Sequence, residues 1–457
     1  MPDEPKTLDP AVRPARTSAP AATTTPPGAA ATAGDSPAPG PARRLTLGLV
    51  TVGLVLAALN LRPAITSLGA LLEEVSSDLH MSGTVAGVLT SVPPLCFAVF
   101  GITAPRLARR FGPAAVVCAG MAAIFAGLLL RPFAGGTAGF LAASALALMG
   151  IAVSNVLMPV IVKRYFPDRI GSMTGLYSMA LALGTSIAAA ATVPMTDALG
   201  GDWRVGLGVW AAIAALAVLP WIPLVRDRDR TATTPAGPRA EATATSRATA
   251  GATAAAGTGA TTAAAPRITR SRTAWALGVF FGLQATGAYI TMGWMPQIFR
   301  DAGVPASTAG VLLAVTMVMG VPLAFVIPRL ATRMKNQGPI VVALGLCGLT
   351  GYTGLFLAPS AGAWVWAVLL GISNCSFPLA LTMIGMRSRT GAGVVRLSAF
   401  AQSVGYLISI PGPLLVGVLY QHSGGWGLPI VLMGSLMIPQ MIVGTLAGRD
   451  RTVEDEC

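Results

Sequence analysis

The sequence predicts an all-α membrane protein with twelve transmembrane helices in two pseudo-symmetric six-helix bundles. Three observations predict this fold. The chain of 457 residues is 53% hydrophobic and only 11% charged, whereas soluble domains carry about 25% charged residues. Its apolar segments are long enough to cross a hydrocarbon core of about 30 Å as helices. The two halves of the chain also share punctuating residues in the same order.

Each half contains six apolar segments. In the first half they cover approximately 45–72, 84–104, 113–131, 136–162, 172–196 and 203–225. In the second half they cover approximately 273–298, 308–330, 339–358, 362–386, 397–420 and 426–447. The segments are rich in Ala, Leu, Gly and Val and lack the alternation of outer-membrane strands. We therefore expect helices and no barrel.

Two low-complexity stretches separate and precede these segments. Residues 1–44 are dominated by Ala, Pro and Thr, a composition that cannot repay the entropy of folding, so we expect a disordered tail. No signal-peptide core precedes Leu45, and we expect no cleavage. Residues 226–272 open with RDRDR and continue in Thr, Ala and Gly, which predicts a flexible linker. The predicted bundles are then 45–225 and 273–447, with a second tail at 448–457.

Orientation follows from the basic residues, because short loops rich in Lys and Arg stay in the cytoplasm. Of the 31 Lys and Arg residues, 27 fall on the side of the termini and linker. Three fall on the opposite side, Arg131, Arg204 and Arg300, and Arg62 lies within a span. The sequence therefore predicts a multi-pass protein of the cytoplasmic membrane with both termini in the cytoplasm.

The internal repeat is specific. Gly87 and the loop residues Pro105 and Arg106 recur 223 positions later as Gly310, Pro328 and Arg329. At an offset of 219, three residues of the fourth segment recur in the tenth: Ser154, Asn155 and Pro159 match Ser373, Asn374 and Pro378. A duplicated six-helix unit explains these matches, and such repeats are typical of transporters.

Composition and spacing exclude several function classes. The net charge of +13 lies in short loops, without a basic helix or aromatic platform to bind nucleic acid. Four of the five cysteines lie inside apolar segments without CxxC spacing, so we predict no metal site, no disulfide framework and no cofactor. His, Asp and Glu are missing from the interior of the segments, which argues against a membrane-embedded enzyme.

The arrangement of six plus six helices around a central linker is similar to the major facilitator superfamily. In the superfamily's usual loop motif an Asp follows Gly by four residues, and here Pro105 takes its place after Gly101. The chain resembles most the branch of cyanate and 2-nitroimidazole transporters. Six strings carry this resemblance: LNLRPAITSLGALL, GVLTSVPPLCFAVFGITAPRLARRFG, GLYSMALALG, GLQATGAYITMGWMPQIF, FPLALTMIGMRSRT and RLSAFAQSVGYL.

The resemblance implies a transporter that moves a small solute across the membrane by alternating access. Arg62 is the strongest candidate for solute binding, because an ionisable residue inside a span costs about 3 kcal/mol and its guanidinium suits a small anion. The alternative is that Arg62 snorkels outward to lipid head groups or to Glu73. Pro63 removes a helix hydrogen bond to Leu59, so we expect the backbone near Asn60 to bend, for transport or only for packing.

The resemblance also implies that the first, fourth, seventh and tenth helices line the cavity. Their polar residues are candidate solute ligands: Asn60, Ser154, Asn155, Gln284, Tyr289, Ser373 and Asn374. Gln402, Tyr406 and Tyr177 belong to flanking helices and are further candidates. Hydrogen bonding between helices is the alternative for each. The loop residues Arg106, Arg110, Arg329 and Arg333 are interpreted as topology determinants that also stabilise the closed packing of a gate.

The sequence allows more than one energy source and more than one transported solute. No Lys follows Gly, so the chain has no phosphate-binding loop for ATP. Protons or a counter-anion are the coupling partners that we consider, besides simple facilitated diffusion. We expect a monomer that carries a cyanate-like anion, a nitro-heterocycle or a small organic anion. Efflux of small aromatic drugs is the main alternative, and a non-transporting sensor is the other.

Overall fold

The computed structural model describes residues 41–225 and 268–456. The predicted tail at 1–40 and most of the predicted linker, 226–267, lie outside the described residues, as does Cys457. Within the described ranges the chain forms helices and no strands, as the sequence predicts.

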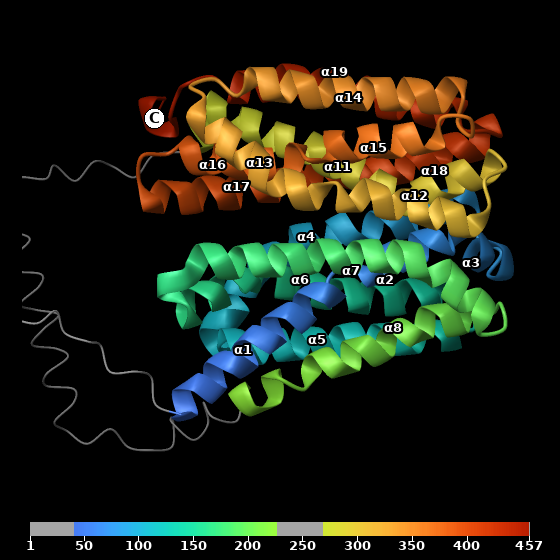
Figure 1. Ribbon diagram of the computed structural model, residues 1–457, viewed down its shortest axis with the longest axis horizontal. Helices are drawn as coiled ribbons and strands as arrows, with labels where there is room; N and C mark the ends of the chain where they lie inside the picture. The colour runs from blue at the N-terminus through green and yellow to red at the C-terminus, as the bar shows by residue number, and fades with distance from the viewer. Residues whose placement is uncertain (1–40, 226–267, 457) are drawn as a thin grey trace, which may run out of the picture. The chain divides into compact units, whose positions relative to one another are not determined.

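Among the described residues of the first half, coloured blue to green in Figure 1, eight α-helices have defined bounds. They are α1 (Pro41–Asn60), α2 (Pro63–Ala70), α3 (Leu72–Asp78), α4 (Gly83–Phe111), α5 (Pro113–Leu130), α6 (Thr137–Tyr165), α7 (Ile170–Ala198) and α8 (Trp203–Val218). Short 3-10 turns follow α5 (η1, Arg131–Phe133) and α6 (η2, Pro167–Arg169). After a turn, residues 221–225 are helical again.

The second half contains nine α-helices, coloured yellow to red in Figure 1. They are α11 (Arg272–Asp301), α12 (Ala306–Val318), α13 (Gly320–Arg333), α14 (Gly338–Leu357), α15 (Ala363–Asn374), α16 (Ser376–Met386), α17 (Gly391–Ser409), α18 (Pro411–Ser423) and α19 (Gly427–Ala447). Short 3-10 turns precede α11 (η3, Ile268–Arg270) and follow α19 (η4, Val453–Asp455).

These helices make the twelve predicted crossings. Ten helices or helix pairs among the described residues are long and apolar enough to span a membrane. The sixth crossing, α8, is a shorter apolar helix. The seventh, α11, is 30 residues long and interrupts its apolar run with polar residues such as Gln284 and Thr286. Most of α11 is buried, which is typical of a helix surrounded by other helices.

Four of the apolar crossings are interrupted near their middle, each ahead of a proline. A proline removes the hydrogen bond to the carbonyl four residues before it. Breaks occur in this way before Pro63 (between α1 and α2), Pro322 (α12 and α13), Pro378 (α15 and α16) and Pro413 (α17 and α18). The sequence predicts the bend at Pro63, and the other three breaks are new findings. Pro159, Pro194 and Pro296 stay inside continuous helices, so a proline alone does not determine a break.

The two halves meet along paired helices. Helix α4 packs against α17 and α18, and α7 packs against α12. We call the end that carries Arg272 and Ala447 the terminal end, and the end that carries α3 the opposite end.

The terminal end of the second half is more ordered than the sequence predicts. The last residues of the predicted linker, 268–272, form η3 and the start of α11. Arg387 is only 2% exposed, although it belongs to a predicted loop. Its guanidinium donates to the carbonyls of Ala447 and Gly448, at 3.1 and 2.8 Å, and to Gln337. These bonds satisfy carbonyls at the end of α19 and attach the last described residues to the bundle.

Candidate functional site

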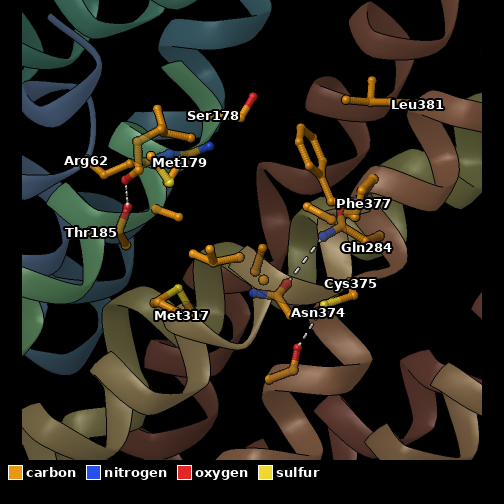
Figure 2. A pocket seen from close by; sticks show the side chains of 18 of the residues that line it. Arg62, Ser178, Met179, Thr185, Gln284, Met317, Asn374, Cys375, Phe377 and Leu381 are labelled. Carbon is orange, nitrogen blue, oxygen red and sulfur yellow. Dashed lines mark hydrogen bonds between the residues drawn. The ribbon is translucent and has the colours of Figure 1, made fainter. Parts of the chain in front are cut away.

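A cavity of about 440 Å³ lies between the two halves. Figure 2 shows its two walls: Arg62, Ser178, Met179 and Thr185 come from the first half, and Gln284, Asn374, Cys375 and Phe377 come from the second. A cavity of this volume holds a small organic molecule.

Arg62 enters this cavity from a break in the first crossing. Helix α1 ends at Asn60, and Arg62 is the N-cap of α2, with its carbonyl accepting from the amides of Ile65 and Thr66 at 2.9 and 3.1 Å. The side chain is half-buried and interacts with the hydroxyl of Tyr289 in the second half. Among the described residues that line the cavity, Arg62 alone is charged. The site therefore has one fixed positive charge.

The alternative that pairs Arg62 with Glu73 is wrong. Glu73 instead accepts from Arg300, with Nη2 and Oε2 at 2.9 Å. Arg62 therefore keeps its guanidinium for the cavity.

Four residues predicted on the first, seventh and tenth crossings line the cavity together: Arg62, Gln284, Tyr289 and Asn374. Gln284 Nε2 donates to Asn374 Oδ1 at 3.3 Å, which joins two elements of the second half, α11 and the break after α15. Tyr406 lines the cavity as well and stacks on Phe97, with ring centroids 5.0 Å apart. The second half thus supplies neutral amides and aromatic rings opposite the charge.

Six predicted residues do not line it: Asn60, Ser154, Asn155, Tyr177, Ser373 and Gln402. The Asn60 amide donates to the carbonyls of Leu56 and Ile213 at 2.8 and 3.5 Å, inside the first half. Gln402 Nε2 donates to Ser398 Oγ at 2.7 Å, and Asn155 is half-buried in α6. For Asn60 the bond to Ile213 of α8 matches the alternative of hydrogen bonding between helices, whereas the Gln402 bond lies within α17. Tyr177 is likewise absent from the lining, whereas its neighbour Ser178 is present.

The polar face of α7 is a part of the site that our sequence reasoning missed. Thr174, Ser178, Ala182 and Thr185 all line the cavity. Their spacings of four, four and three residues follow the helical period, so they lie on one face of the helix. This pattern of small and hydroxyl residues was visible in the sequence and could have been used to predict the lining.

The opposite end is closed by contacts between the halves. Arg300 of α11 makes two hydrogen bonds to Glu74 of α3, at 3.0 and 2.8 Å. Thr84 of α4 donates from its amide and hydroxyl to Gln421 Oε1 of α18, at 2.9 and 2.7 Å. Of the ion pairs within the described ranges, only those of Arg300 join the two halves.

Glycines bring backbones together in the same region. An ideal Cβ placed on Gly69 of α2 would lie 2.1 Å from the Met292 carbonyl oxygen of α11. One placed on Gly310 of α12 would lie 2.5 Å from the Ala189 carbonyl oxygen of α7. Only glycine allows such approaches. The cavity itself continues the other way, past Phe325 and Thr382, toward the terminal end.

The four predicted gating arginines form no ion pair within the described ranges. Arg106, Arg110, Arg329 and Arg333 are exposed at the terminal end. Arg110 lies over the ring of Phe111, with Cζ 5.2 Å from the ring centroid.

Arg131 is a buried cation that the sequence reasoning assigned to a short loop. It is completely buried, and its guanidinium donates to Ser144 Oγ at 3.0 Å and to the Ala64 carbonyl at 2.9 Å. Its Cζ also lies 5.7 Å from the ring centroid of Phe140. These contacts fix α2 to α6 directly after the break at Arg62. Arg131 therefore positions the helix that presents Arg62.

Comparisons with known proteins agree with this geometry. The model of the Major Facilitator Superfamily matches residues 45–388. The "Uncharacterized transporter YycB" of Bacillus subtilis is 34% identical, over 88% of this chain and 94% of its own. Two proteins of Escherichia coli are also similar. The 2-nitroimidazole transporter is 30% identical over 89% and 96%, and the cyanate transport protein CynX is 28% identical over 84% and 94%.

A solved structure shares the fold. A bacterial homolog of the human lysosomal transporter Spinster, in an inward-facing and occupied conformation, superposes with a TM-score of 0.69 at 16% identity. The match covers 92% of this chain and 99% of the other. Together these matches confirm the resemblance on which the sequence analysis relied.

Proposed function

Because the chain belongs to the major facilitator superfamily and is a membrane transporter, we propose that it carries a small anion with a flat, partly apolar body. The observation that supports this most is the single charge of Arg62 in the central cavity. A guanidinium offers planar, paired donors that fit a carboxylate, a nitro group or cyanate. Two relatives are named as carriers of 2-nitroimidazole, a flat nitro-heterocycle, and of cyanate, a small anion, and the proposed cargo combines these two features.

The rest of the lining fits the body of such a solute. Tyr289, Tyr406 and Phe377 supply ring faces, and Met179 and Met317 supply polarisable apolar surface. Gln284 and Asn374 supply neutral donors and acceptors on the far wall. In this proposal Arg62 binds the anionic group, and the amides orient the remainder. The same aromatic lining favours the second candidate, efflux of small aromatic drugs.

We further propose that both ends of the chain are cytoplasmic and that this conformation faces inward. The excess of Lys and Arg on the terminal side supports the orientation. The closed contacts at the opposite end and the extension of the cavity toward the terminal end then correspond to one state of alternating access. Breaking the Arg300 contacts and separating the paired helices would lead to the outward-facing state.

The test is uptake into proteoliposomes of labelled cyanate, 2-nitroimidazole and a small aromatic carboxylate, in wild type and in Arg62→Gln. Hydrogen bonds to a charged group contribute about 1.5–3 kcal/mol, so we expect apparent affinity for the anions to fall about 10- to 150-fold. Arg62→Lys should retain part of the affinity, since it keeps the charge without the planar donors.

Arg396→Gln is the matched control, because Arg396 is exposed and does not line the cavity. It should transport at the wild-type rate. If Arg62→Gln inserts normally and carries every anion at full rate and affinity, the proposed site is wrong. The drug-efflux alternative would be favoured by a different pair of results. In that case the wild type transports no anion, and Arg62→Gln transports uncharged aromatic compounds as well as the wild type or better.

A further inference from the structure

A second, much smaller cavity lies in the second half, directly behind the wall of the central cavity. Its volume is about 20 Å³, enough for a single water molecule or ion. Gln284 and Asn374 line both cavities, so they form the partition between them. The remaining polar lining comes from Thr291 of α11, Tyr352 of α14, Ser373 of α15 and Gln440 of α19.

Two carbonyl oxygens in this lining have no hydrogen-bond partner among the described residues. They are Gln284 Oε1 and Gln440 Oε1, in side chains that are 4% and 3% exposed. Their amide nitrogens are already engaged, since Gln284 Nε2 donates to Asn374 Oδ1 and Gln440 Nε2 donates to Ser376 Oγ at 3.4 Å. A buried acceptor without a donor costs about 1–3 kcal/mol. Both oxygens therefore call for a positively polarised partner.

Other polar groups surround these two unpartnered carbonyl oxygens. Helix α15 ends at Asn374 and α16 begins at Ser376, so the cavity lies beside a break in the tenth crossing. The Ser373 hydroxyl is directed to Met437 Sδ at 3.9 Å, which leaves its oxygen lone pairs unused by a donor proton. Six lining residues have a side-chain oxygen: Gln284, Thr291, Tyr352, Ser373, Asn374 and Gln440. Asn374 Oδ1 already accepts from Gln284, and the side chains of Tyr352 and Thr291 are hydrogen-bonded to each other. None of the lining residues carries a charge.

From these observations we propose that the small cavity binds one sodium ion. Neutral carbonyl and hydroxyl oxygens suit a hard monovalent cation, whereas divalent calcium and magnesium sites use carboxylates, and zinc or copper sites use imidazole or thiolate. Discontinuous helices in other transporters bind sodium with the same elements, a half-helix C-terminus and nearby oxygens. The cavity holds one monovalent ion at most, and the comparison of sodium with potassium below tests which ion it prefers.

The site connects to transport through Gln284, and this step rests on the proposed anion cargo. Sodium bound at Gln284 Oε1 fixes the plane of an amide that also lines the central cavity. The charge of the ion also offsets the charge of the anion across a shared wall. We therefore infer that sodium binding raises the affinity for the anion and that the two move together.

The first experiment needs no solute. The thermal unfolding midpoint of the purified protein is measured in NaCl, KCl and choline chloride at equal ionic strength. A ligand that binds only the folded state raises the midpoint in a saturable way, so we expect a rise with NaCl and little or none with the other salts. An equal midpoint in all three salts would mean that the cavity holds water only, and the proposal would be overturned.

Single-residue variants test whether the sodium-dependent rise of the thermal midpoint comes from this cavity. Gln440→Leu removes one unpartnered oxygen and should abolish the sodium-dependent rise, whereas Gln402→Leu, an amide outside both cavities, should keep it. Gln440→Glu supplies a carboxylate at the same place and should lower the sodium concentration for half-saturation about tenfold, which tests the site even if Gln440→Leu fails to fold. A rise that is unaltered in Gln440→Leu and Gln440→Glu would put the sodium site elsewhere.

Uptake in proteoliposomes then tests the coupling. An inward sodium gradient should increase anion uptake in wild type and have no effect in Gln440→Leu. Sodium-dependent stabilisation together with sodium-independent uptake would leave the site standing and refute the coupling. Stabilisation without uptake of any anion would refute the anion proposal instead, so the two failures can be distinguished.

Discussion

The two halves have the same helix plan but present different chemistry to the cavity. In the first half the break in the first crossing lies at Arg62, a cation. In the second half the break in the tenth crossing lies beside Asn374, a neutral amide. The repeated triad of Ser, Asn and Pro sits in a continuous helix at Asn155 and at a break at Asn374.

A single residue offers a reason for this difference. Ser376 Oγ donates to the Ser373 carbonyl at 2.8 Å, where the helix is interrupted. At the repeat offset of 219 the first half has Leu157, which cannot donate. A break leaves carbonyls that need donors, so the half with a hydroxyl at this position can sustain the break. The two halves therefore share the number and order of their helices because they are repeats of one unit. Single residues determine where a helix breaks and exposes polar groups in each half.

Replacing the proline at each break by alanine restores a backbone amide. The two variants test whether the break that carries the cation Arg62 matters more than the break beside the neutral Asn374, and they should give the largest effect. Pro63→Ala returns a donor for Leu59 and straightens the first crossing, which withdraws Arg62 from its position. We expect apparent anion affinity to fall about tenfold or more, because a charge-assisted bond is weakened. Pro378→Ala moves only neutral Asn374 and should cost about fivefold. Uptake kinetics measure both, and an equal loss in the two variants would contradict the contrast.

The ion pairs at the opposite end should give a smaller effect. Arg300→Gln removes the bonds to Glu73 and Glu74 that join the halves. Partly exposed pairs contribute up to about 1 kcal/mol, so the population that is open at this end should rise about fivefold. Spin labels at Ser77 and Ser423, one in each half, would report this as a larger share of long distances in pulsed electron resonance.

A matched control exists at the same end. Arg204→Gln breaks the pair between Arg204 and Asp78, at 2.7 Å, which lies within the first half. It should leave the distance distribution unchanged. A shift as large as that of Arg300→Gln would mean that any lost charge at this end opens the protein.

The smallest effect concerns the terminal end of the second half. Glu456 accepts from Ser271 Oγ at 2.6 Å and from the amide of Thr273 at 2.9 Å, at the start of α11. Burial alone would raise the pKa of Glu456, but these hydrogen bonds outweigh it and hold the pKa below its usual value of about 4.3. A carboxyl with a lowered pKa stabilises the fold at neutral pH and loses this contribution as pH falls through its folded pKa.

Glu456→Gln should therefore have a slightly lower thermal midpoint than wild type at pH 7, and the difference should shrink below about pH 4. Thermal unfolding between pH 7 and pH 3 measures this. The control is Asp197→Asn, at an exposed carboxylate near the end of α7. A difference for Glu456→Gln that stays constant down to pH 3 would show that the ionised carboxylate is not its source.

The helix plan was predictable because hydropathy and charge asymmetry act over whole segments. The bend at Pro63 was predictable because proline acts locally. The break after Asn374 was not, since it depends on Ser376 as well as on Pro378. Asn60 and Gln284 are both amides within apolar segments, and the sequence does not distinguish them. Asn60 bonds a carbonyl of α8 because α8 packs beside it, whereas Gln284 lines the cavity because of the position of α11.

Arg131 is another residue whose surroundings could not be predicted from the sequence. Arg131 follows an apolar run and precedes Pro132, which is the pattern of a loop. Its burial depends on Ser144 and on the Ala64 carbonyl, which come from other crossings. Partners distant in sequence cannot be found from the periodicity of one segment.

The glycine contacts at the opposite end have a consequence for electrical insulation. At Gly69 and Gly310 main chain lies directly on main chain, too close even for a methyl group. No file of water molecules fits between those helices, and a proton hops through a membrane protein only along such a file or along titratable side chains. At these two seams, between α2 and α11 and between α7 and α12, the main-chain contact therefore leaves protons no path through water.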